Sequence, residues 1–251
     1  MLSPFKKIRW SALRSAQFRK YISYAIGEIV LVVVGILIAV SINGRIQSSK
    51  EKKIEQHYYR EMQLDFEENH RQAQAVISHY KTLIPRLILL LEQSALDSVT
   101  LPVDSLNTFY GEVEIMPTYS SMDRVYNTIM GSGDLKLIKD QKLKSLLAEY
   151  YESLHMLNLV QETHELQLVN SIQPYTIKNL DFQAILYEPF DEYDLAPPVD
   201  SDRILEVIHQ REFRNVVTLK WQISMDLWTQ VESIQEINKD ILKALDSRLE
   251  E

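Results

Sequence analysis

Three Glu-x-x-His pairs are the residues whose types and spacing best suggest chemistry. They are Glu67/His70, Glu152/His155 and Glu206/His209. Helical bundles that hold two metal ions use two such pairs together with a glutamate from each of two other helices. The pattern raises one alternative function, a metal-dependent (di-metal carboxylate) oxidoreductase.

The apolar neighbours of these pairs argue against that alternative. In a helix, Leu154 and Leu157 point to the same side, which turns Glu152 and His155 outward. Only His70 lies close to an apolar stripe of its own segment. We therefore expect no metal site, no catalytic residue and no cofactor.

The composition excludes several other kinds of site. The chain has 251 residues, no cysteine and only six glycines. Without cysteine there is no disulfide scaffold, thiolate metal site or cysteine nucleophile. The Gly-Ser-Gly turn at residues 131–133 is not followed by Gly-Lys-Ser/Thr, so it is not a phosphate loop. We expect a protein that is not an enzyme.

Charge divides the chain into a basic head and an acidic body. Residues 1–53 contain ten Lys or Arg and two acids, and the remaining 198 residues contain 17 basic and 33 acidic side chains. An acidic body disfavours nucleic acid as a partner, because binding it requires clustered cations.

Residues 21–42 form an apolar run whose one charged residue is Glu28. A bilayer core needs about 20 apolar residues in a helix, so the run predicts a transmembrane helix. A buried core helix is one alternative. A cleaved signal peptide is another, since Ala39 and Ser41 have the small-x-small spacing of a cleavage site.

The charges around the span predict its orientation. Six cations and no acid precede it, whereas four cations and Glu51 follow it closely. Positive charge is retained on the cytoplasmic side, so we expect a cytoplasmic N-terminus and an extracytoplasmic body.

Glu28, Gly35 and Ala39 form a candidate contact between membrane helices. Glu28 and Gly35 are seven residues apart and share a helix face, which Ala39 continues. Small residues on one face let two helices approach closely, and an intramembrane ionisable group suggests function. We expect a homo-oligomer or a membrane-protein partner. The alternative is that Glu28 simply lies near the headgroups.

Residues 24–43 read YAIGEIVLVVVGILIAVSIN. This stretch resembles the signature of a family of single-span membrane proteins in Gram-negative bacteria, the domain-of-unknown-function family numbered 6090. The matching positions are Tyr24, Ala25, Gly27, Glu28, Gly35, Ile36, Ala39, Ile42 and Asn43. The resemblance implies a bacterial inner-membrane protein with a periplasmic helical body, and it implies no activity.

A second match lies at residues 126–151, which resemble the family's SG-x-L-x-LI and terminal YY pattern. One departure follows the span. The family usually continues with a tryptophan-containing run, whereas residues 43–47 here read NGRIQ and contain no aromatic anchor.

The body is expected to be helical. Residues 45–84 contain neither proline nor glycine and carry an apolar stripe, so the membrane helix is predicted to continue into them until Pro85 kinks it. A second long helix is predicted at residues 141–173, with Asp140 as its N-cap and Pro174 as its end. Loops are expected near residues 94–118 and 174–200, and the first has room for a short helix at Ser105–Tyr110. Ser120-x-x-Asp123 predicts the start of another helix, which the Gly-Ser-Gly turn at residues 131–133 ends.

The last helical stretch opens at Asp200 or Ser201 and contains a heptad seam, which indicates coiled-coil packing. The seam consists of Leu227, Val231, Ile234, Asn238, Ile241 and Leu245.

These patterns predict an all-α protein. Residues 1–20 are a basic cytoplasmic head, 21–43 a transmembrane helix, and 44–251 an elongated extracytoplasmic bundle of three long helices and one short one. The expected function is non-enzymatic: a membrane-anchored protein acting by protein–protein or ligand interaction, as a scaffold, an assembly factor or a sensing ectodomain.

Overall fold

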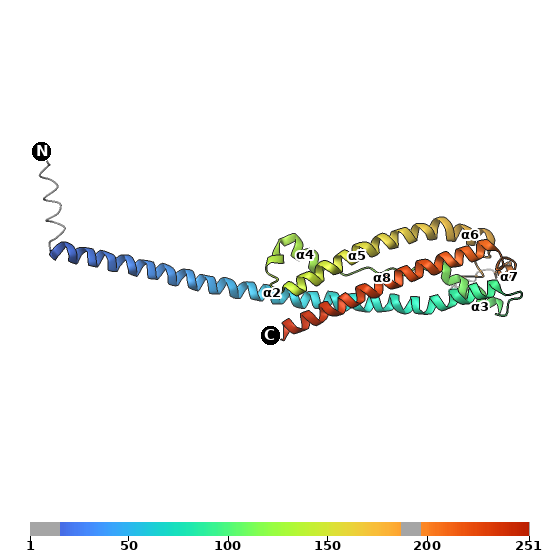
Figure 1. Ribbon diagram of the computed structural model, residues 1–251, viewed down its shortest axis with the longest axis horizontal. Coiled ribbons are helices and arrows are strands. Elements are labelled where there is room, and N and C mark those ends of the chain that lie inside the picture. The colour runs from blue at the N-terminus through green and yellow to red at the C-terminus, as the bar shows by residue number, and fades with distance from the viewer. Residues whose placement is uncertain (1–15, 187–196, 251) are drawn as a thin grey trace, which may run out of the picture. The chain divides into compact units, whose positions relative to one another are not determined.

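The computed structural model describes residues 16–186 and 197–250. The expected basic head lies outside this part of the chain except for its last five residues, and so does the middle of the expected loop at 174–200. The described residues form helices and no strands, which confirms the all-α class (Figure 1).

The helices, in chain order, have the following bounds. They are α2 (Ala16–Ala95), α3 (Val103–Gly111), η1 (Glu112–Glu114), α4 (Arg124–Ser132), η2 (Asp134–Lys136), α5 (Gln141–Gln167), η3 (Leu168–Ile172), α6 (Gln173–Asn179), α7 (Arg203–Val207) and α8 (Arg211–Leu249). Three α-helices, α2, α5 and α8, are long, as expected. The expected bundle has one short helix, whereas the described chain has four short α-helices, α3, α4, α6 and α7.

The chain divides into two compact units between Gln56 and His57, and α2 contributes to both. In the first unit every large apolar side chain from Tyr21 to Ile46 is exposed. This part of α2 includes an 18-residue window apolar enough to cross a bilayer, and none of that window is buried. The helix is therefore a candidate membrane span.

In the second unit, the part of α2 from His57 onward packs with α5 and α8 (Figure 1). Asp140, before α5, binds Arg248 near the end of α8 at 2.8 Å, and His164 near the end of α5 lies 3.7 Å from Asp226. Contacts that pair early residues of one helix with late residues of the other mean that α5 and α8 run antiparallel.

The core follows the predicted apolar faces. All six seam residues of α8 are buried, as are the residues predicted to line the inner face of α5: Leu143, Leu147, Tyr150, Leu154 and Leu157. Within the seam, Asn238 is fully buried, and its side-chain amide has no hydrogen-bond partner among the described residues.

Two predicted helix boundaries agree with the structure. The carboxylate of Asp140 accepts a hydrogen bond from the Leu143 N–H at 3.0 Å, which caps α5. Gly133 ends α4 with φ of 72°, a left-handed conformation that glycine adopts without steric cost.

Other boundaries were predicted wrongly. Pro174 does not end the second long helix, because the π-helical turn η3 precedes it and the chain continues as α6. A π turn widens the backbone and relieves the clash between a proline ring and the carbonyl four residues earlier. The last helical stretch also breaks between α7 and α8. Within the expected loop at 94–118, by contrast, α3 forms at the place of the short helix expected at Ser105–Tyr110, and η1 extends it.

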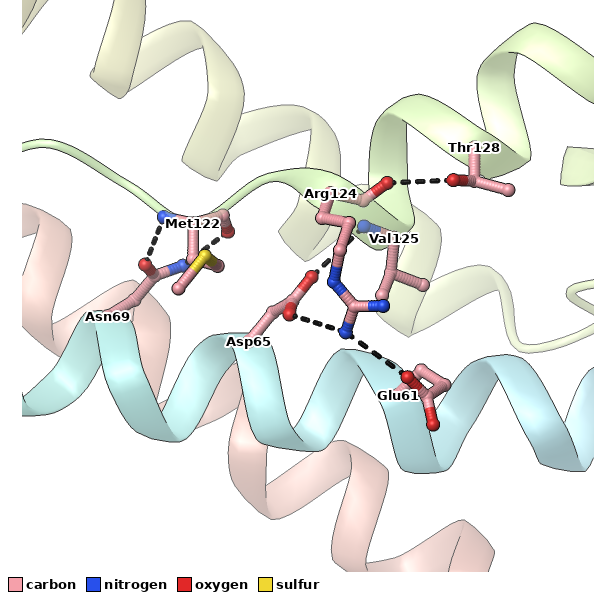
Figure 2. A network of polar contacts seen from close by, with 7 residues as sticks. All are labelled: Glu61, Asp65, Asn69, Met122, Arg124, Val125 and Thr128. Carbon is pink, nitrogen blue, oxygen red and sulfur yellow. Dashed lines mark hydrogen bonds and ion pairs between the residues drawn. The ribbon is translucent and has the colours of Figure 1, made fainter.

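Residues 115–123 form an extended crossover segment that leads from η1 back to α4. Its backbone cannot pair with a neighbouring strand, so side chains satisfy it. The Asn69 amide of α2 accepts from the Met122 N–H at 2.5 Å and donates to the Met122 carbonyl at 3.0 Å (Figure 2). Gln161 of α5 holds both backbone groups of Tyr119 in the same way, at 2.8 and 3.2 Å.

The N-terminus of α4 is capped by a residue from another helix. Asp65 of α2 accepts a hydrogen bond from the Val125 N–H at 3.0 Å, whereas the adjacent Asp123 makes no side-chain cap (Figure 2). Arg124 bridges Asp65 and Glu61 at 3.2 and 3.1 Å. The helix start predicted from Ser120-x-x-Asp123 therefore depends on α2 instead.

We expect Asp65→Ala to loosen α4, because the change removes the cap and leaves the buried Val125 N–H without an acceptor. Loss of an N-cap costs about 1 kcal/mol. Hydrogen exchange at the Val125 amide should accelerate roughly fivefold if the site opens locally. The matched control, Asp123→Ala, should leave this exchange unchanged, and equal effects of the two substitutions would contradict the assignment.

Candidate functional site

The predicted membrane-helix contact lies on a fully exposed face of the first unit. Glu28, Gly35 and Ala39 are all exposed on α2. A Cβ added at Gly35 would meet no atom within 4 Å. The glycine is therefore not required by the packing of the described chain, and the face is free to contact another helix.

The Glu-x-x-His pairs do not assemble. Glu67, Glu152 and Glu206 are all exposed. A di-metal centre needs carboxylates that project into the bundle interior, so these pairs lack the geometry of the alternative function. In the part of the chain that the structure describes, no three His, Asp or Glu side chains come together as metal ligands.

A buried lysine, which the sequence analysis missed, occupies the interior of the second unit. Lys220 of α8 is only 1% exposed, and its Nζ donates a hydrogen bond to the Ile115 carbonyl at the start of the crossover segment. Burial lowers the pKa of Lys220 to about 8, and the nearby Glu114 carboxylate opposes that shift. A charged group this deeply buried requires partners.

The partners of Lys220 come from several elements. Glu114 of η1 hydrogen bonds the Thr176 hydroxyl of α6, which also contacts the Tyr110 hydroxyl at 3.1 Å. Burial raises the pKa of Glu114, while the Thr176 hydrogen bond and Lys220 lower it. Glu112, which belongs to η1 like Glu114, forms an ion pair with Arg86 of α2. We call Lys220, Glu114, Thr176 and Tyr110 the buried polar centre.

The charge of Lys220 lowers the pKa of two histidines near this centre. Burial lowers the pKa of His79 on α2 and of His164 on α5, and the positive charge of Lys220 lowers both further. Asp226 opposes the shift at His164. Both imidazoles are therefore neutral near pH 7.

One signal in the sequence would have located Lys220. The heptad seam, extended backward from Leu227 in steps of three and four, passes through Ser224, Lys220 and Val217. A lysine at a core position of such a seam marks a buried charge and hence a special environment.

A second hollow lies between α5 and α8. It has a volume of about 360 Å³ and is lined by Leu159, Val160, Thr163, His164, Asp226, Thr229 and Gln230. Unlike the buried polar centre, it opens to solvent on the outside of the second unit, where Thr163 and Asp226 are exposed.

Comparisons of this chain with protein-family models, curated proteins and solved structures give no match. The resemblance to the domain-of-unknown-function family therefore stays a prediction from the residues quoted above.

We expect the stability that Lys220 confers to rise with pH. The pKa of the lysine is about 8 in the folded chain and returns to its ordinary value of 10.5 on unfolding, so between these values the unfolded chain binds more protons and the free energy of unfolding increases. Relative to Lys220→Met, the wild type should gain roughly 3 kcal/mol across this range.

Urea unfolding followed by the fluorescence of Trp221 and Trp228 on α8 measures this difference at pH 7 and pH 10. The buried tyrosines, whose pKa values are raised, lower stability at high pH equally in both proteins, so their effect cancels. A difference that does not change with pH would show that Lys220 is not a buried ammonium group.

Proposed function

We propose that this protein is a single-span membrane protein whose helical second unit acts by binding a partner, as a scaffold, an assembly factor or a sensing ectodomain, and not as an enzyme. The observation that carries the proposal is the exposed apolar segment of α2, because every large apolar side chain from Tyr21 to Ile46 lacks cover from the described chain. Exposed apolar surface of this extent needs a lipid or protein environment.

The helix itself favours a span over a core helix or a short leader. A core helix of a soluble protein would be mostly buried, whereas none of the apolar window is. Helix α2 also runs without interruption through residues 39–41, the small-x-small site of a signal peptide, and on to Ala95. A span continuous with the first helix of the second unit would tether that unit directly to the bilayer.

We place the head in the cytoplasm and the second unit in the periplasm of a Gram-negative bacterium. Six cations before the span support this orientation, and the family resemblance supports the location. The mechanism is presentation: a tethered helical unit offers its surfaces to partners near the membrane.

A reporter fused after Glu251 tests the orientation. Alkaline phosphatase, which requires an oxidising compartment, should be active, and green fluorescent protein at the same position should be inactive when exported unfolded. Replacing Lys6, Lys7, Arg9 and Arg14 with Gln should reduce phosphatase activity, because the charge bias that sets orientation is weakened. Phosphatase inactivity in the unmodified chain would overturn the orientation, and an intact mass shortened by about 40 residues would show that the span is cleaved.

Disulfide trapping tests the predicted contact at Glu28, Gly35 and Ala39. Because the chain has no cysteine, Val32→Cys introduces a single thiol on the face that Glu28 and Gly35 share. We expect a crosslinked dimer in membranes, and we expect Gly35→Leu to remove most of it by keeping the helices apart.

Gly44→Leu is the matched control. Gly44 lies nine residues after Gly35, on the opposite face of the helix, and an added Cβ there also meets nothing within 4 Å. Equal loss of crosslinking in both variants would contradict a specific face. Absence of any crosslinked dimer would exclude self-association through this face and leave a different membrane protein as the partner.

A further inference from the structure

The outer face of α5 carries an apolar stripe that the described chain leaves uncovered. Met156, Leu159 and Leu166 are 51, 44 and 63% exposed and, with Thr163, follow the three-and-four spacing of one helix face. The core-facing residues of α5, such as Leu157, lie on the opposite side. We call Met156, Leu159, Thr163 and Leu166 the α5 stripe.

The groove between α5 and α8 lies directly beside this stripe, since Leu159 and Thr163 belong to both. The His164 side chain in its lining is only 7% exposed, and its Nδ1 has no hydrogen-bond partner among the described residues. Its Nε2 is 3.7 Å from the Asp226 carboxylate, too far for a hydrogen bond. The groove therefore offers both a carboxylate and a buried imidazole with unused hydrogen-bonding capacity.

Acidic residues outnumber basic ones on the parts of α5 and α8 that form the groove. Residues 145–177 contain four glutamates and no Lys or Arg. Residues 215–238 of α8 contain three acids, and their one cation, Lys220, is buried. On α5, the exposed Glu152 and Glu162 lie on the same face as the stripe, at helical spacing from Met156 and Leu166. An apolar stripe flanked by acids complements an apolar stripe flanked by cations.

We propose that the α5 stripe and the α5–α8 groove form the docking site for a basic amphipathic helix of a partner protein, with a Lys or Arg side chain inserted in the groove. The aliphatic stem would pack on Leu159 and Val160, and the charged head would donate to Asp226. This proposal rests on the proposed function, because it names the chemistry of the partner that the tethered unit binds.

Two physical arguments support this occupant. An amphipathic helix laid along a groove anchors through side chains at the spacing that the α5 stripe displays. A cation beside an acid also forms a hydrogen bond stronger than a neutral one, and it does so here next to an imidazole that burial keeps neutral and able to accept. Among the described residues of the groove lining, Asp226 is the one carboxylate and no Lys or Arg is present, so the charge of the groove favours a cation over an anion.

The experiment uses the full chain in phosphatidylcholine nanodiscs, which carry no net lipid charge. The probe is a fluorescein-labelled helical peptide of about five turns, with leucine on one face and lysine on the other. Fluorescence anisotropy should show saturable binding that weakens with salt. Asp226→Asn and Leu166→Gln should each raise Kd about tenfold, a loss typical of a central contact.

Matched variants and probes separate recognition from general attraction. Asp104→Asn removes an equally exposed acid from α3, and Leu64→Gln removes an exposed apolar side chain from α2; both should leave Kd unchanged. The same peptide with glutamate in place of lysine should not bind. All four substitutions are at exposed positions, so identical thermal melts will show that folding is intact.

Three results would overturn the docking site. They are equal Kd values for all variants, binding of the glutamate peptide, and a stripe-dependent dimer of the chain in mass photometry, which would make a second copy the occupant. If the peptide fails to bind while the fusion shows an inserted, correctly oriented protein, the docking site fails and the proposed function stands. If the fusion contradicts a membrane span while the peptide binds as predicted, the proposed function fails instead.

Discussion

The second unit depends on one constraint, which is that a segment with no neighbouring strand needs other partners for the backbone groups that it turns toward the bundle. Residues 115–123 pass between α2 and α5 without a neighbouring strand, and an unpaired buried amide or carbonyl costs about as much as a lost hydrogen bond. Side chains meet this constraint. Asn69 binds both the N–H and the carbonyl of Met122, Gln161 does the same for Tyr119, and the Tyr80 hydroxyl donates to the Pro117 carbonyl at 3.1 Å. Lys220 does the same for Ile115, which explains why a cation lies in the core.

Much of the helical architecture followed from local patterns. Apolar spacing predicts which faces of α5 and α8 are buried, and Asp140 marks the start of α5 because a carboxylate before a helix satisfies its free amides. Features that depend on distant residues were not predictable in this way. Asp65 caps α4 by binding the Val125 N–H, 60 residues later in the chain, and η3 accommodates Pro174, so neither the residue that caps α4 nor the continuation into α6 has a local signal.

The two proposed contact surfaces show the same division. The face containing Glu28 and Gly35 was predicted from the sequence, because a charge and small residues are conspicuous in an apolar run, and it stays a prediction. The α5 stripe was not, because α5 is apolar on two faces and the spacing that predicts a core, from Leu143 to Leu147 onward, marks only one of them. Which of two apolar faces meets the core is decided by the packing partner, here α8, and not by the helix itself.

The path of the crossover segment also sets the order in which the fold can close. Asn69 and Gln161 reach Met122 and Tyr119 across 53 and 42 residues, whereas Lys220 reaches Ile115 across 105. Synthesis runs from the N-terminus, so the growing chain contains Asn69, Met122 and Gln161 before it contains Lys220, and the contacts of the segment with α2 and α5 can form before its contact with α8.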